Sequence, residues 1–170
     1  GCGVTFGPYS ITVLNAAIDT SNVTGTDASC FGAASGTASL SISGGSGIYT
    51  VDWLGQNTGH TSTTDNPTDL LADTYDVTIT DDNACQRTFT SAVTIDEPDS
   101  ISIVKAVNDV LCYGGSSGSI INTAVTGGTP FSSGDPYLYE WHDGTEVIAT
   151  TQNINGVSAG DYTYTVTDAN

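Results

Sequence analysis

The stretch YDVTITDDNACQRTF, Tyr75–Phe89, carries the pattern that decides the fold. Apolar residues alternate with hydroxyl and acidic residues as far as Ile79, which is the pattern of a strand with one buried face. The polar cluster Thr80–Asn83 then predicts a turn. Beyond Cys85 the chain continues to Phe89, where we expect the next strand.

The same alternation recurs outward from this stretch, and no sustained helical pattern accompanies it. A short helix within Asn15–Ser21 is considered but given little weight. Clusters rich in Gly, Pro and Asn separate the alternating runs and predict turns. Short strands at this spacing predict an all-β fold, a β-sandwich. Further strands are expected at Ala38–Ser43, Ile48–Leu54, Ser100–Val107, Ser119–Val125, Tyr137–Trp141 and Tyr162–Thr167.

Four aromatic residues are predicted to lie in the core. Trp53 and Trp141 follow Gly-rich turns in alternating strands, where an inward indole could cover the space between two sheets. Tyr75 and Tyr162 each follow a short turn and open a strand, which is the position of a tyrosine corner.

The chain contains two copies of one repeat. Cys30-Phe31-Gly32 recurs as Cys112-Tyr113-Gly114, and Gly44-Gly45 recurs as Gly127-Gly128. The order of these and the other anchors is the same in both copies, so chance agreement is a poor explanation.

The turn Thr80–Asn83 recurs as Thr167–Asn170, but the two copies continue differently. The first copy runs on through Cys85 and Phe89, whereas the matching residues of the second copy stand at the start of the chain, as Gly1-Cys2, Phe6 and Tyr9–Val13. We therefore expect residues 1–16 to be the final strand of the preceding unit's domain. Residues 17–98 would be a complete repeat, and residues 99–170 a repeat that lacks its last strand.

Composition excludes several function classes. The 170 residues contain 2 Lys and Arg against 19 Asp and Glu, for a net charge of -17. Such a surface repels phosphate backbones, so no nucleic-acid partner is expected. No apolar run reaches the roughly 18 residues of a membrane span, so direct membrane insertion is not expected either. The two histidines fit no catalytic motif, and we predict that the protein is not an enzyme.

The four cysteines suggest an oxidising compartment. Within the complete copy the natural intrachain disulfide joins Cys30 to Cys85. Cys112 would then pair across units with Cys2 of the next unit. The alternatives are that Cys2 and Cys112 are free thiols or pair within the chain.

The ordered motifs resemble the SprB-type repeat, over nearly the whole chain. The first copy departs from the pattern at Ala72-Asp73-Thr74, and residues 13–16 replace the expected Glu-Pro. The resemblance implies an immunoglobulin-like domain, export by type 9 secretion and a role in long adhesive cell-surface structures, including those of gliding bacteria, rather than catalysis. In the first copy it is carried by Cys30-Phe31-Gly32, Gly44-Gly45, Trp53, Tyr75, Thr80–Asn83, Cys85 and Thr94–Pro98.

Ligand sites are predicted at three places. Tyr137 and Tyr139 lie beside an inserted loop and would form a sugar-binding platform if their rings were exposed. Calcium could bind Asp81, Asp82 and Asp168 near the domain ends, although Asp also stabilises turns without a metal. Otherwise no cofactor is expected. Asn22-Val23-Thr24 is a glycosylation sequon.

The leading functional hypothesis is a non-enzymatic structural repeat of an extracellular filament or cell-surface adhesin, with surface attachment and gliding motility as its uses. Its partners would be adjacent copies of itself, linked along one polypeptide or by strand addition between subunits. The competing hypothesis is a carbohydrate-binding module of a secreted protein, with surface polysaccharide as its partner.

Overall fold

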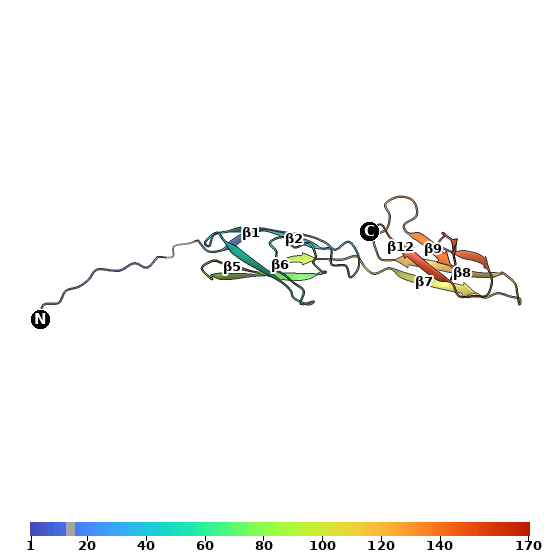
Figure 1. The fold of residues 1–170 in the computed structure, drawn as a ribbon, viewed down its shortest axis with the longest axis horizontal. Coiled ribbons are helices and arrows are strands. Elements are labelled where there is room, and N and C mark those ends of the chain that lie inside the picture. Colours follow the sequence, from blue (N-terminus) through green and yellow to red (C-terminus); the bar gives the residue numbers. More distant parts are fainter. Residues whose placement is uncertain (13–15) are drawn as a thin grey trace. The chain divides into compact units, whose positions relative to one another are not determined.

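A computed structural model describes residues 1–12 and 16–170, and its contacts divide them into two units. The first unit comprises residues 1–26 and 37–95, and the second comprises residues 27–36 and 96–170. The regular structure in the described residues is β-strand throughout (Figure 1). Within these ranges we find no helix with the length and apolar character needed to cross a membrane.

The first unit is a sandwich of two sheets. The smaller sheet pairs β1 with β2, and the larger has the order β4-β3-β5-β6. Every second residue of β5 is buried, because one face of this strand covers the core. Residues 16–21 form no helix, since β1 already begins at Asp19. The strands are β1 (Asp19–Thr26), β2 (Thr37–Ser43), β3 (Tyr49–Gly55), β4 (Thr61–Ser62), β5 (Asp73–Asp81) and β6 (Gln86–Ile95).

The second unit repeats this topology with two differences, an added strand β11 beside β8 and the lack of a described counterpart of β6. Its sheets have the orders β11-β8-β7 and β10-β9-β12, so β7, β8, β9, β10 and β12 take the places of β1 to β5. No described strand takes the place of β6. The expected all-β class and tandem immunoglobulin-like sandwich are confirmed. The strands are β7 (Ser102–Asn108), β8 (Gly118–Thr126), β9 (Leu138–His142), β10 (Val147–Ala149), β11 (Ile154–Val157) and β12 (Thr163–Thr167).

Both units contain a buried tryptophan and a tyrosine corner. The indole nitrogens of Trp53 and Trp141 donate to the carbonyl oxygens of Thr64 and Thr151, so neither buried N–H lacks a partner. The Tyr75 hydroxyl donates to the Leu71 carbonyl at 3.0 Å, four residues upstream. The Tyr162 hydroxyl donates to the Ser158 carbonyl at 2.9 Å in the same way.

Removing the hydroxyl of Tyr75 tests the importance of its corner. We expect Tyr75→Phe to lower the free energy of unfolding of the first unit by about 1 kcal/mol, since the hydrogen bond from the buried Tyr75 side chain to the Leu71 carbonyl is lost. Urea denaturation measures the change. Tyr113→Phe is the matched control, because Tyr113 is fully exposed and should tolerate the change. Equal stability of Tyr75→Phe and the unmodified chain would contradict the expectation.

Gly-Gly pairs close the same turn in both units. Gly44 and Gly127 have φ of 79° and 83°, and a Cβ on either would collide with the carbonyl oxygen of Ala17 or Ser100. The following amides, of Gly45 and Gly128, donate to the chain just before the first strand of each unit, at Ala16 and Asp99. This close backbone contact explains why the motif occurs twice.

Asp73 is a structural residue that sequence reasoning missed, since it registered only as a departure from the repeat pattern. Its buried carboxylate accepts hydrogen bonds from the amides of Asn57 and Thr58 and from both of their side chains. Burial acts to raise the pKa of Asp73, but the hydrogen bonds from Thr58 and Asn57 outweigh it and hold the pKa well below its usual value. One carboxylate therefore fixes the chain that follows β3.

Candidate functional site: an open sheet edge in the second unit

The outer edge of β12 is the feature that most clearly distinguishes the two units. In the first unit β5 is a central strand, hydrogen-bonded to β3 on one side and β6 on the other. In the second unit β12 pairs with β9 through Thr163–Thr167, and no described residue pairs with its other edge. Such an edge is a template for another strand.

The core beside this edge is incompletely covered. Tyr75, Val77 and Ile79 of β5 are fully buried, whereas the matching residues Tyr162 and Tyr164 are only half-buried. On the opposite sheet, every residue of β7 is exposed. In the first unit Val93 and Ile95 of β6 contact β1, the counterpart of β7, at Gly25. The second unit is therefore open where the first is closed by β6.

A cavity of about 270 Å³ lies at the open side of the core. Asn122 lines this cavity and is only 2% exposed. Its Nδ2 donates to the Gln152 carbonyl at 2.5 Å, but its Oδ1 has no hydrogen-bond partner among the described residues. A buried acceptor without a partner is costly and marks a place where a donor is missing. The lining residues are Ile103, Lys105, Ile120, Asn122, Trp141, Tyr162 and Tyr164.

Tyr164 forms one wall of this cavity. Its ring stacks on Trp141, with 4.1 Å between ring centroids, and on Tyr139, with 6.0 Å. Burial, together with repulsion from Tyr139, raises the pKa of Tyr164 to about 12. The wall is thus an aromatic surface that is already partly shielded from water.

Residues 1–12 have the sequence of a sixth strand but no partner in the described chain. They form no regular structure (Figure 1). Their apolar side chains Val4, Phe6, Tyr9 and Ile11 are exposed. Aligning Cys2 with Cys85 places Phe6 at the position of Phe89. Val13–Asn15, the end of the expected strand, lie outside the described residues.

The alignment also specifies a register. In the first unit Phe89 lies opposite Val77, so Phe6 would lie opposite Tyr164. Gly7-Pro8 would fall where β6 bulges at Ser91, a residue with φ of 52°. Gly and Pro within a strand are typical of such bulges.

Two aspartates hold the turn that leads out of β5 and β12. Asp81 Oδ1 accepts the amides of Asn83 and Cys85, at 3.0 and 2.9 Å. The equivalent Asp168 Oδ1 accepts the Asn170 amide at 3.2 Å, and its Oδ2 accepts that of Thr129 at 2.7 Å. The described residues of the second unit thus contain the first half of the turn that reaches β6 in the first unit.

Calcium binding at Asp81, Asp82 and Asp168 stays a prediction. Two of these carboxylates already accept backbone amides, and the described ranges contain no cluster of three His, Cys, Asp or Glu arranged to hold a metal. Asn22 is exposed on β1, and its glycosylation also stays a prediction.

The expected intrachain disulfide between Cys30 and Cys85 is not formed in this structure, where both are free thiols at opposite ends of β6. The Ala28 amide donates to the Asp96 carbonyl, so the loop that contains Cys30 lies where β6 ends. Cys85 directly precedes the ten residues of β6. Ten residues of strand span about 33 Å, whereas a disulfide needs Cα atoms within about 7 Å.

The same geometry argues against a bond between Cys2 and Cys112 in a completed second unit. Cys2 would enter beside Asp168, at the end where β7 begins, because Gly128 and Ala169 hydrogen-bond to Asp99 and Thr129 there. Cys112 follows the far end of β7. Both thiols are free and exposed in this structure.

The predicted sugar platform at Tyr137 and Tyr139 is wrong in this structure, because both rings are buried. They are 4% and 6% exposed, and the Tyr137 hydroxyl donates to the Gly127 carbonyl at 2.7 Å. These strand positions face the core, and the inserted loop does not turn them outward.

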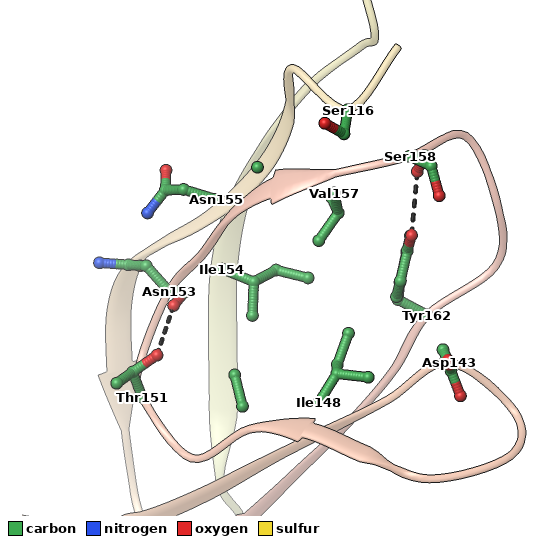
Figure 2. Close-up of a pocket in the computed structure, with 12 residues that line it drawn as sticks. Ser116, Asp143, Ile148, Thr151, Asn153, Ile154, Asn155, Val157, Ser158 and Tyr162 are labelled. Carbon is green, nitrogen blue, oxygen red and sulfur yellow. Dashed lines mark hydrogen bonds between the residues drawn. The ribbon is translucent and has the colours of Figure 1, made fainter. Parts of the chain in front are cut away.

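The largest pocket described, about 570 Å³, lies elsewhere in the second unit and is open to solvent (Figure 2). Figure 2 shows Tyr162 bonded to Ser158 and Thr151 bonded to Asn153 across its rim. Asp143 supplies a carboxylate, but Thr145 and Glu146 donate to it and lower its pKa to about 2. These polar groups bond to the chain itself rather than converging on the opening.

Comparison with known proteins agrees with the repeat. The family model of the SprB repeat matches residues 22–58 and 104–146. The SprB repeat model thus matches one segment in each copy of the repeat. The matched segments run from β1 into the residues after β3, and from β7 into those after β9. The family is one of structural repeats of cell-surface proteins.

The search of curated proteins found no match. Among solved structures, this chain is similar to the three N-terminal domains of the bacteriophage RB49 Highly Immunogenic Outer Capsid protein (Hoc), with 20% identity and a TM-score of 0.41. That match covers 91% of this chain and 55% of the other, so the chain spans about half the length of that structure.

Proposed function

We propose that this chain is a non-enzymatic structural repeat of an extracellular filament or cell-surface adhesin. The copies join head to tail, and residues 1–16 of one copy complete the second unit of another. The observation that carries the proposal is the unpaired edge of β12 beside an uncovered core, together with residues 1–12 that match β6.

Strand insertion would satisfy both partners. The unpaired backbone N–H and C=O groups of β12 would gain hydrogen-bond partners, and the exposed Phe6 would leave water. Because the donor and acceptor are different surfaces, the contact does not close on itself and extends into a chain of copies. Repetition would then give surface attachment through many weak contacts.

The joint can be covalent or can form between separate subunits. In the first arrangement one polypeptide continues from Asn170 into another Gly-Cys, and in the second the subunits polymerise. Mass under reducing and denaturing conditions distinguishes them, since about 17 kDa per chain is expected for subunits. In either arrangement the location is extracellular, at the cell surface.

Assembly of the chain tests the proposal directly. Sedimentation of the chain of residues 1–170, with reductant present, is expected to show oligomers whose size grows with concentration. Phe6→Asp should abolish them, because a carboxylate would be placed against Tyr164 in the core. Thr5→Asp is the matched control, since Thr88, its counterpart in β6, is exposed. If the chain is a monomer at all concentrations, strand insertion between separate subunits is contradicted. If two copies joined in one polypeptide also show no strand insertion, the insertion proposal is contradicted altogether.

The carbohydrate-binding alternative lacks a supporting observation, because the rings on which it depended are buried. Surface polysaccharide stays a predicted partner of the assembled structure.

A further inference from the structure

We propose that Cys30 forms a disulfide with Cys2 of the copy whose first residues complete the second unit. This inference rests on the proposed function, because Cys2 reaches its place only through strand insertion. It replaces both pairings expected from sequence spacing.

The loop that carries Cys30 belongs to the second unit, next to the point where β12 leads out. The Ala28 amide donates to the Asp96 carbonyl at 2.9 Å, and the Gly32 amide donates to Glu97 Oε2 at 2.6 Å. Asn170 Nδ2 donates to the Ser29 carbonyl at 2.8 Å. The neighbour of Cys30 is thus hydrogen-bonded to the residue that ends the turn motif.

The first unit shows where the incoming cysteine would lie. Cys85 stands two residues beyond Asn83, with its amide on Asp81 Oδ1 and its carbonyl accepting the Asp81 amide. Asn170 and Asp168 repeat the positions of Asn83 and Asp81. An inserted Gly1-Cys2 would therefore place Cys2 two residues beyond Asn170.

The distances suit a disulfide. Two residues of chain reach at most about 7 Å, and the side chain of Asn170 already contacts the residue beside Cys30. The Cα atoms of a disulfide lie about 4.4–6.8 Å apart. The incoming Cys2 can therefore come close enough to Cys30 for a disulfide.

The second copy of the loop supports the same rule. Cys112 and Tyr113 repeat Cys30 and Phe31, but Tyr113 is fully exposed whereas Phe31 is 61% exposed. Cys112 is likewise exposed and Cys30 only partly so. Cys112 is a free thiol in this structure. By the same alignment, it would form a disulfide with Cys85 of the next copy. Each joint between copies would then carry two disulfides.

The reaction needs an external two-electron oxidant, and a small-molecule disulfide suffices. Cys30 and Cys2 lose two protons and two electrons as their S–S bond forms, and oxidised glutathione becomes two glutathione thiols. The product would lock the inserted strand against withdrawal.

The experiment uses an extended chain, in which residues 1–16 are repeated directly after Asn170 and the leading Cys2 is replaced by Ser. After oxidation with glutathione, peptide mapping is expected to join Cys30 to the added cysteine. Cys30→Ser should remove this link, and the matched control Cys112→Ser should leave it. A link from Cys30 to Cys85, or from the added cysteine to Cys112, would overturn the proposal.

A measurement in reductant separates this inference from the proposed function. If the added strand raises the melting temperature without any disulfide, insertion holds, and a missing link to Cys30 then overturns only the disulfide. If the melting temperature does not rise, insertion fails and the disulfide fails with it.

Discussion

Repeating residues 1–16 after Asn170 is expected to raise the melting temperature of the second unit by about 10 °C under reducing conditions. A gain of about 2 kcal/mol corresponds to a shift of that size in a domain of 60–100 residues. The gain arises because Phe6 of the added copy becomes buried, as its counterpart Phe89 is packed against the first core, and because β12 acquires a second partner. Calorimetry of the extended and original chains measures it.

Two controls make this prediction specific. The extended chain with Phe6→Asp in the added copy should melt like the original chain. The extended chain should also sediment as a monomer, because its own added strand occupies the only acceptor edge proposed here. An unchanged melting temperature, or oligomers of unaltered size, would contradict strand insertion.

Asp73→Ala is expected to destabilise the first unit by about 3 kcal/mol, since the substitution leaves several buried donors of Asn57 and Thr58 without their charged acceptor. Urea denaturation of the chain measures the loss. Asp52→Ala is the matched control, because Asp52 is exposed on a strand of the same sheet and should change stability little. Equal stability of the two variants would contradict the role given to Asp73.

The pH dependence of the first unit follows from the same residue. Because the pKa of folded Asp73 is below its usual value, the folded state favours the ionised carboxylate. Its contribution is complete above the unfolded pKa of about 4 and is lost as the pH falls toward the folded value. Unfolding measured between pH 7 and pH 3 should show a steeper loss for the original chain than for Asp73→Asn.

Sequence alternation predicted the strands whose one face covers a core. Tyr75–Ile79 and Tyr162–Val166 alternate because every second side chain must be apolar; β5 contains the first segment, and β12 contains the second from Thr163 onward. β1 escaped prediction because Val23 is its one aliphatic side chain larger than alanine. Its strand character comes from pairing with β2 and from contact with β6, which no local pattern records.

The cysteine pairing could not be read from spacing. A loop length gives the entropy of closure but does not say at which end of a strand each cysteine lies. Cys30 and Cys85 have a plausible separation along the chain, yet β6 separates them by its full length. The platform at Tyr137 and Tyr139 failed for a similar reason, since alternation does not tell which face of a strand is buried.

The open edge of β12 was expected from the repeat alone, because Ala84-Cys85, which follow Asn83 in the first copy, have their counterpart for the second copy at Gly1-Cys2. The side-chain environment of this edge could not be predicted from the sequence. The unpartnered Oδ1 of Asn122 and the half-covered stack of Tyr164 on Trp141 depend on side chains from different strands.

The contact between Phe6 and Tyr164 tests the central claim most directly. Nuclear Overhauser effects in selectively labelled extended chain should join the ring of the added Phe6 to that of Tyr164, with slow amide exchange along β12. Random-coil shifts for the added residues together with fast exchange at Thr163–Thr167 would contradict the account.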